Sequence, residues 1–332
     1  ILDGYCENPG DLSWDVLRAL GELTVYDRTD DTDVAQIVQR IGNAEIIVIN
    51  KTPITRQVID ACPSLRFITI MATGYNVVDC AYAAQKGIAV ANVPAYGTAA
   101  VAQFAIALLL EICMHVGDHA EAVQAGRWTA CADFCFWDTP LIELAGMTMG
   151  IIGFGRIGRQ VGRIARAMGM RVLAYSRTET EEGRAIAEYV PLETLLAESD
   201  VITLHTNATE ENHHLIDAKA IETMKPGAVI INTARGKLID SDALIAGLES
   251  GKLGGAALDV LENENGLYYY NRMGDVIPNP ELAALRSMPN VILTDHTAFY
   301  THEDVESMVR GVLESAVAFE KGQPTRHDVT DR

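Results

Sequence analysis

The sequence has no cysteine framework, no long apolar run and no surplus of positive charge, and each absence excludes a class of protein. Its six cysteines are spread irregularly along 332 residues, which excludes a disulfide-stapled domain and fits free thiols in a reducing compartment. No apolar run reaches the roughly 20 residues that a membrane-spanning helix needs. The longest candidate, Val101 to Cys113, is interrupted by Gln103 and Glu111. We therefore expect a soluble, cytoplasmic protein.

The charge balance narrows the choice of partners. The chain has 45 acidic and 26 basic residues, a formal charge of −19. A surface of this sign repels the phosphate backbone of nucleic acids and anionic membranes alike. We expect neither as a partner, and a small-molecule substrate instead.

Short apolar runs alternate with segments of helical period. Continuous apolar strands between helices are typical of a parallel sheet covered on both faces, so the fold class is α/β. The predicted strands are Ile46 to Ile49, Phe67 to Ile70, Ile88 to Val93, Met149 to Gly153, Val172 to Tyr175, Val201 to Leu204, Val229 to Asn232, Ala256 to Val260 and Val291 to Thr294.

The strand series starts afresh after an irregular stretch, Gly126 to Leu144. This indicates two doubly wound domains, residues 1–97 completed by a C-terminal helix in 300–332, and residues 98–299. A helix from Thr98 to about Ala125 is expected to connect them, and the C-terminal helix to open near Thr301.

The irregular stretch is rich in aromatic side chains, at positions 128, 134, 136 and 137. They are too many for a plain solvated loop, so they either lie buried under a domain or form a subunit contact. We favour a contact in a homodimer. Cys131 and Cys135, with His115 and His119 before them, lack the spacing of a metal site, and we expect no metal.

The segment GIIGFGRIG fits a dinucleotide-binding loop. Gly153, Gly155 and Gly158 form GxGxxG between a predicted strand and a predicted helix, the context that gives this motif its meaning. The glycines permit a tight turn, close approach of a pyrophosphate and close helix packing, while the helix N-terminus attracts the anion.

The next strand ends in Ser176 and Arg177, where such sites usually have an acid. An acid binds the ribose hydroxyls and repels a 2′-phosphate, whereas arginine can bind that phosphate. We therefore favour NADP(H) over NAD(H). Glu179 and Glu181 lie close in sequence and oppose this preference, and the alternative is that Arg177 points into solvent.

Three polar residues follow successive predicted strands of the second domain. These are Arg235 in NTARG, Glu264 in ALDVLENE and His296 in TDHTAFY. Ligands of open α/β sheets bind at the carboxyl ends of strands. Arginine can hold a carboxylate, histidine can give a proton to a carbonyl oxygen, and a carboxylate can orient that histidine. The set suits hydride reduction of a 2-oxo acid.

The motifs GFGRIG, NTARGKLID, GGAALDV and TDHTAFY resemble the D-isomer-specific 2-hydroxyacid dehydrogenase family over essentially the whole chain. The resemblance implies Rossmann-type and flavodoxin-like domains, the latter binding substrate, and a homodimer. It implies that Arg235, Glu264 and His296 are catalytic. The implied substrate contacts are Thr73, Gly74, Tyr75 and Tyr96. The implied cofactor contacts are Gly153, Gly155, Arg156, Ile157, Gly158, Ser176, Arg177, Thr206, Thr233, Ala234 and Asp259, the last on the nicotinamide carboxamide.

Two subgroup resemblances differ in the substrate they imply. ILDGY to DFCFWDTPLIELAG resembles glycerate dehydrogenases, or hydroxypyruvate reductases, whereas ENENGLYYYNRMGD to HTAFYT resembles D-lactate dehydrogenases. We rank hydroxypyruvate or glyoxylate first, with D-lactate-type or larger apolar substrates as the alternative. Asn207 and Asp295 replace prolines of the family pattern without removing a catalytic group.

Two groups of proteins that resemble this family have other functions. Dinucleotide-sensing corepressors resemble this family, but the sequence has no sign of a peptide groove or a nucleic-acid patch. Formate dehydrogenases pair the histidine with glutamine, and Glu264 speaks against that activity.

Overall fold

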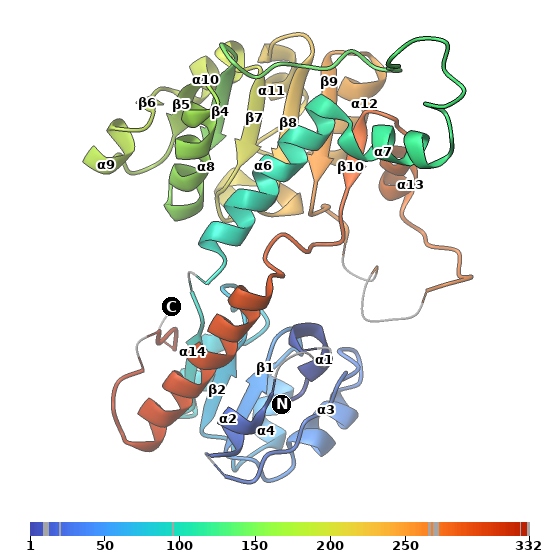
Figure 1. Cartoon of the computed structure of the whole chain (residues 1–332). Helices are drawn as coiled ribbons and strands as arrows, with labels where there is room; N and C mark the ends of the chain where they lie inside the picture. The colour runs from blue at the N-terminus through green and yellow to red at the C-terminus, as the bar shows by residue number, and fades with distance from the viewer. Residues whose placement is uncertain are drawn as a thin grey trace. The chain divides into compact units, whose positions relative to one another are not determined.

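The computed structural model describes residues 1–8, 13–19, 21–94, 96–264, 267, 272–325 and 327–330, without the side chains of residues 6, 7 and 16. The chain divides into two compact units. Unit 1 is Ile1–Gly97 with Tyr300–Arg332, and unit 2 is Thr98–Phe299 (Figure 1). Both are α/β, as the sequence predicts.

Unit 2 is built on a parallel sheet of seven strands in the order β10-β9-β8-β7-β4-β5-β6. The order reverses at β4, which pairs with β5 on one side and β7 on the other, the arrangement of a dinucleotide-binding sheet. Its strands are β4 (Thr148–Ile152), β5 (Arg171–Tyr175), β6 (Glu188–Tyr189), β7 (Val201–Leu204), β8 (Ala228–Asn232), β9 (Leu253–Leu258) and β10 (Val291–Leu293). Its helices are α6 (Thr98–Met114), α7 (Val116–Gln124), α8 (Arg156–Ala167), α9 (Glu181–Arg184), α10 (Leu192–Glu198), α11 (Ala218–Thr223), α12 (Ser241–Glu249) and α13 (Pro280–Arg286), with 3-10 turns η1 (Glu210–Asn212) and η2 (Gly236–Leu238).

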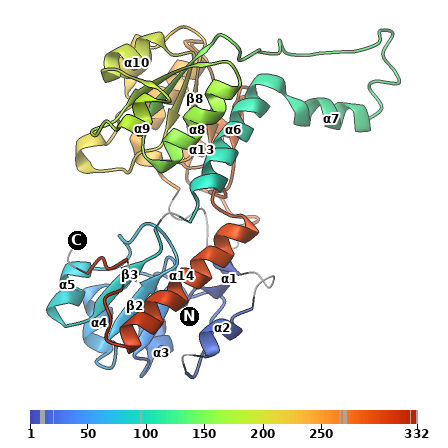
Figure 2. The same cartoon turned by 60° about the vertical axis from the view of Figure 1, so that its left-hand side comes forward.

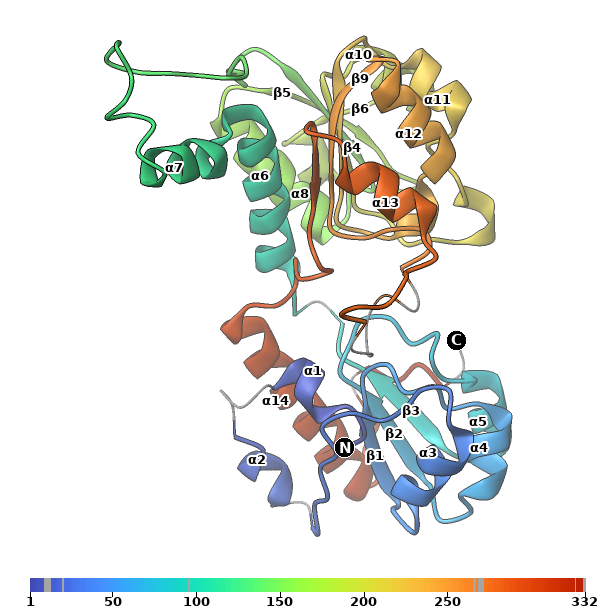
Figure 3. The ribbon, with the colours of Figure 1, turned by 90° about the vertical axis from the view of Figure 1, so that its right-hand side faces the viewer.

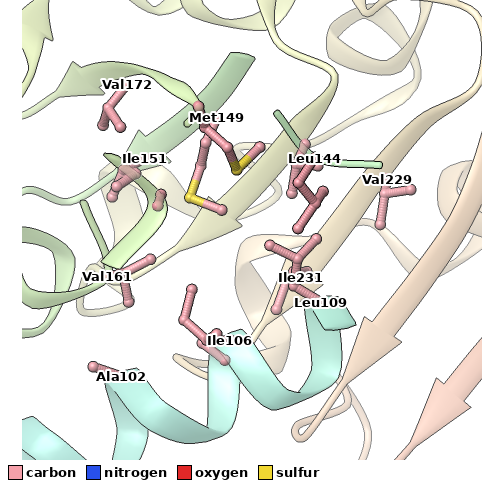
Figure 4. Close-up of a cluster of buried hydrophobic side chains, with 14 of the residues drawn as sticks. Ala102, Ile106, Leu109, Leu144, Met149, Ile151, Val161, Val172, Val229 and Ile231 are labelled. Atoms are coloured by element: carbon pink, nitrogen blue, oxygen red, sulfur yellow. The ribbon is translucent and has the colours of Figure 1, made fainter. Parts of the chain in front are cut away.

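Alternate residues of these strands enter cores on opposite faces of the sheet. On β8, Val229 and Ile231 pack with α6 and α8, whereas Ile230 packs on the other face with α10, α11 and α12. Figure 4 shows the first of these cores, with Ile106 of α6 near the strand side chains. Because both faces are covered, the strands are apolar throughout, which explains their continuous apolar runs.

Unit 1 has three regular parallel strands, ordered β1-β2-β3. Leu2 N donates to Val48 O at 3.0 Å and Tyr26 N to Ile1 O at 2.9 Å, so two irregular segments extend the sheet beyond β1. With them the chain order is 2-1-3-4-5, as in flavodoxin-like sheets. The elements are α1 (Gly4–Glu7), α2 (Asp15–Arg18), α3 (Val34–Ile41), β1 (Ile46–Ile49), α4 (Arg56–Ala61), β2 (Phe67–Ile70), α5 (Cys80–Gln85), β3 (Ala89–Asn92) and α14 (His302–Glu320).

Helix α14 returns to unit 1, where it covers one face of the small sheet (Figure 3). Phe319 stacks on Phe67 of β2 with ring centroids 4.7 Å apart. Thr301 is the N-cap residue, and its side chain accepts from Asp304 N at 3.2 Å. The predicted opening of this helix near Thr301 is confirmed.

The single helix predicted from Thr98 to about Ala125 is wrong, because the chain bends by 60° between α6 and α7. His115 has a left-handed φ of 47°, and Glu111 Oε1 accepts from Gly117 N at 2.9 Å at the start of α7. The apolar pattern ends at the same point: α6 has a buried face, whereas α7 has no buried residue. Among the described residues no single helix is long and apolar enough to cross a membrane, although this bent pair together passes that test.

The segment after α7 extends away from the sheet of unit 2 (Figure 2). Phe134 is 89% exposed, Trp137 66% and Trp128 55%. Phe136 lies against the ring of His119 and under the guanidinium of Arg127. Within the described chain, burial under a domain is therefore excluded for most of these aromatic residues.

Candidate active site

The loop between β4 and α8 carries the glycine motif. Gly153 has a φ of 92°, and a Cβ there would lie 2.4 Å from the carbonyl oxygen of His205. A Cβ on Gly158 would lie 2.3 Å from the carbonyl oxygen of Gly153. Both positions therefore require glycine, one for a left-handed turn against the chain after β7, the other for close approach of α8.

The same loop presents open backbone at a helix N-terminus. Gly155 is the N-cap residue of α8, and a Cβ there would meet no heavy atom within 4 Å. Thr233, after β8, has a buried hydroxyl with no hydrogen-bond partner among the described residues. Because first-turn N–H groups attract phosphate and an orphaned hydroxyl needs a partner, these residues fit a bound dinucleotide.

The other predicted cofactor residues lie at the carboxyl ends of the strands around the switch point. Arg156 and Ile157 open α8, Ser176 and Arg177 follow β5, Thr206 follows β7, Ala234 follows β8 and Asp259 follows β9. Beside Thr206, desolvation lowers the pKa of His205 to about 4, so its ring is neutral near pH 7. Its Nε2 lies 2.9 Å from Thr203 Oγ1.

Arg177 is exposed after β5. Among the described residues, no hydrogen bond or ion pair engages its guanidinium. Of the two acids expected to oppose its effect, Glu179 pairs with Arg184 at 2.7 Å, whereas the exposed Glu181 has no ion pair among the described residues.

Arg235 lies between β8 and η2 in a tightly held turn. The buried side chain of Asn232 accepts from Ala234 N at 3.0 Å and donates to Arg235 O at 2.9 Å. The exposed guanidinium of Arg235 donates to Ala234 O at 2.6 Å. A Cβ on Gly236 would lie 2.0 Å from the carbonyl carbon and oxygen of Leu261. The turn is thus fixed to β8 and pressed against the segment after β9.

Glu264 and His296 are in direct contact. His296 Nδ1 lies 3.0 Å from Glu264 Oε1, and the two side chains are 27% and 20% exposed. Glu264 Oε2 accepts from Leu261 N at 3.2 Å, which fixes the carboxylate. His296 has a left-handed φ of 57°, a conformation that histidine adopts more readily than most residues. Because the carboxylate engages Nδ1, Nε2 is the nitrogen directed away from Glu264.

Asp259 holds the turn that carries His296. Its buried carboxylate accepts from Thr294 Oγ1 at 2.6 Å, Thr297 N at 3.0 Å and Ala298 N at 3.0 Å. Burial raises the pKa of the Asp259 carboxyl, against the opposing effects of these bonds and of His296. The resemblance to the family implies that Asp259 contacts the nicotinamide carboxamide. Within the chain, Asp259 instead accepts hydrogen bonds from the turn that carries His296.

The predicted substrate residues lie in unit 1, at the carboxyl ends of β2 and β3. Thr73, Gly74 and Tyr75 follow β2, and Tyr96 follows β3. Two buried asparagines hold the first segment: Asn50 Nδ2 donates to Met71 O and Asn92 Nδ2 to Thr73 O, both at 2.7 Å.

Sequence reasoning missed Asn50, Asn92, Asn232 and Gly236. The three asparagines each end or follow a strand, which is a usable signal because a side-chain amide can hold a strand-end turn from both sides. Gly236 gives no such signal, since only the folded backbone places Leu261 against it. Part of the motif resembling D-lactate dehydrogenases, residues 265, 266 and 268–271, lies outside the described residues.

Comparisons with known proteins identify the family of this chain. Residues 106–298 match the model of the D-isomer specific 2-hydroxyacid dehydrogenase, NAD binding domain. A hydroxypyruvate reductase of Blautia hydrogenotrophica is 48% identical over 98% of this chain and 97% of its own. An aromatic 2-oxoacid reductase of Clostridium sporogenes is 38% identical, over 77% and 76%.

A solved structure extends the match to the fold. D-lactate dehydrogenase of Aquifex aeolicus, in complex with NAD and lactic acid, superposes with a TM-score of 0.83 at 31% identity, covering 96% of this chain and 95% of its own. The family model spans more than half of the chain, and the first relative almost all of it. The protein therefore belongs to the D-isomer specific 2-hydroxyacid dehydrogenase family, oxidoreductases that act on CH–OH groups with a nicotinamide cofactor.

Proposed function

We propose that the protein reduces hydroxypyruvate or glyoxylate to the corresponding 2-hydroxy acid, with NADP(H) as the favoured cofactor. The observation that carries the proposal is the contact between Glu264 and His296 at 3.0 Å. These residues follow β9 and β10, and Arg235 follows the next strand of the sheet, β8. The hydroxypyruvate reductase similar to this chain supports the choice of substrate.

The three residues divide the chemistry between them. Arg235 holds the substrate carboxylate through paired N–H groups. His296 Nε2 gives its proton to the carbonyl oxygen, and Glu264 holds the ring in place through Nδ1. The bound cofactor supplies the hydride that the carbonyl carbon accepts. Thr73, Gly74, Tyr75 and Tyr96 are the proposed substrate contacts, through backbone N–H groups of Gly74 and Tyr75 and the ring of Tyr96.

The reaction is tested by following the absorbance of the reduced nicotinamide with four acceptors, hydroxypyruvate, glyoxylate, pyruvate and phenylpyruvate. We expect the highest kcat/KM with hydroxypyruvate or glyoxylate. For hydroxypyruvate the reason is that hydrogen bonds to its hydroxyl discriminate more strongly than one methylene does. A higher value with phenylpyruvate would favour the alternative, a reductase of larger apolar 2-oxo acids. Phe299 and Tyr300, which directly follow the turn of His296, would suit such a substrate, and the similar aromatic 2-oxoacid reductase supports it.

The preference for NADP(H) rests on Arg177, whose guanidinium is exposed while its neighbour Glu179 is paired with Arg184. A charge-assisted bond to a 2′-phosphate contributes about 1.5 to 3 kcal/mol. We expect Arg177→Gln to lower the ratio of kcat/KM with NADPH to that with NADH by about 10- to 150-fold.

The matched control is Arg171→Gln, at the opposite end of β5, where the arginine pairs with Glu188 and Glu198 at 2.8 Å. It should leave the ratio unchanged. If Arg177→Gln leaves the ratio unchanged as well, Arg177 does not bind the phosphate.

The homodimer is proposed from the exposed aromatic residues after α7. Apolar side chains this exposed and this close in sequence mark a contact surface. We expect the protein to elute in gel filtration at twice its chain mass of 36.0 kDa, and Phe134→Ser with Trp137→Ser to shift it toward the monomer. Val276→Ser, at a valine 93% exposed elsewhere in unit 2, is the control and should not change elution. A wild-type monomer would rule the dimer out.

A further inference from the structure

Two histidines and two carboxylates gather beside the segment that carries Glu264, and the proposed reaction uses none of them. His213 and His214 follow η1, Glu262 follows β9, and Asp240 precedes α12. Potential ligand atoms of His213, His214 and Glu262 all lie within 4.8 Å of one another. We call these three residues the His-Glu cluster.

One oxygen of Glu262 faces both imidazoles. His214 Nε2 is hydrogen-bonded to Glu262 Oε1, and His213 Nε2 lies 3.7 Å from the same oxygen. The two rings stack with centroids 3.9 Å apart. On the other side, His214 Nδ1 lies 3.6 Å from Asp240 Oδ2. His214 is thus flanked by a carboxylate at each nitrogen.

One ring proton cannot satisfy both carboxylates that flank His214. A neutral imidazole carries its proton either on Nε2, toward Glu262, or on Nδ1, toward Asp240, so one of its nitrogens presents a lone pair to a carboxylate. His213 presents a nitrogen to the same oxygen, and two protonated rings at this distance repel each other. A single cation between the two Nε2 atoms and Glu262 would satisfy all three groups.

We propose that the His-Glu cluster binds one divalent transition-metal ion of the Zn²⁺ class. Two imidazole nitrogens and one carboxylate oxygen suit Zn²⁺, Co²⁺ or Ni²⁺ and disfavour Mg²⁺ and Ca²⁺, which prefer oxygen ligands. Bonds of about 2.0 to 2.1 Å in a tetrahedron bring ligand atoms to roughly 3.3 Å from one another. Rotation of His213, whose side chain is 46% exposed, closes most of the remaining gap and leaves a fourth position for water.

The surroundings supply the outer contacts that metal sites use. A carboxylate at the second nitrogen of a ligating histidine orients the ring, and Asp240 has that place. Ser241 Oγ donates to Glu262 Oε2 at 3.2 Å, and His214 N donates to Lys237 O at 2.9 Å. The metal would therefore tie the chain at His214 to the segment that leads from Glu262 to Glu264.

The test is isothermal titration of chelator-treated full-length protein with Zn²⁺, together with the visible spectrum of added Co²⁺. We expect saturable binding of one ion per chain, and Co²⁺ bands typical of four or five ligands. His213→Gln should weaken binding at least tenfold while keeping the contact of His214 with Glu262. Zn²⁺ should raise the Tm of the wild type and not that of His213→Gln, because a ligand of the native state stabilises it by mass action.

The control is His119→Gln, at a histidine outside the His-Glu cluster whose ring stacks on Phe136, the residue that follows Cys135. It should bind Zn²⁺ as the wild type does. The proposal fails if the wild type shows no saturable binding at micromolar Zn²⁺, if His213→Gln binds with unchanged affinity, or if His119→Gln is the variant that loses the ion. None of these outcomes depends on reductase activity.

Discussion

Replacing His296 by asparagine is expected to lower kcat for 2-oxo acid reduction by roughly a hundredfold or more. The amide has no acidic proton to give to the carbonyl oxygen, so the hydride would have to arrive at an unassisted carbonyl. Asparagine is the suitable replacement because it tolerates the left-handed φ of 57° at this position, so the turn should keep its shape. The measurement is the initial rate with saturating cofactor, together with the Kd of NADPH from its fluorescence.

The Kd should change little, since His296 is not among the predicted cofactor contacts. Asp295→Asn is the control: Asp295 is the exposed neighbour of His296, and its replacement should leave kcat within a few-fold of the wild type. Wild-type turnover in His296→Asn would show that another group supplies the proton.

Gly236→Ala is expected to lower kcat/KM by about a hundredfold without unfolding unit 2. The added Cβ would lie 2.0 Å from the carbonyl group of Leu261 and 2.3 Å from Glu262 N, and both are backbone atoms that cannot rotate away. The turn of Arg235 and the segment of Glu264 must therefore move apart. A misplacement of about 1 Å in a catalytic constellation can cost about a hundredfold in rate.

Gly117→Ala is the matched control, because the nearest atoms to a Cβ there belong to the flexible side chain of Glu111, the closest at 3.0 Å. It should keep wild-type kinetics. Circular dichroism establishes that Gly236→Ala is folded, and the Kd of NADPH is measured beside kcat/KM because Thr233 and Ala234, predicted cofactor contacts, immediately precede the displaced turn. Unchanged kcat/KM in Gly236→Ala would mean that the two segments separate without displacing Arg235 or Glu264.

The strands were the most predictable part of this fold. Buried parallel strands must be apolar on both sides, so β1, β2 and β7 have the bounds that the sequence predicts. β6 was missed because it is only two residues long. The bend at His115 was missed because the sequence there has no proline, and Gly117 and the loss of a buried face are the only marks of the end of α6.

The sequence predicted at which strand ends the site residues lie, but it predicted the contacts between them less well. Strand order is implied by the switch point, which is why Glu264 and His296 could be expected at neighbouring ends. The hydrogen bonds of Asp259 to the turn of His296 were not expected. A buried acid after a strand can equally accept hydrogen bonds from a bound ligand or from a turn of its own chain. Choosing between these requires the path of residues 294–298, which depends on packing in three dimensions.

The segment 294–298 determines how stable the site is against local unfolding. β10 is the shortest strand of the sheet after β6 among the described residues, it lies at the sheet edge, and it pairs only with β9. Edge segments with few pairs open locally at a lower free energy than the core does. His296, the proposed proton donor, thus follows a weakly paired edge strand, and the three hydrogen bonds of Asp259 hold its turn in place. The rate at which the enzyme loses activity should therefore depend on local unfolding of this sheet edge and not on global unfolding of the protein.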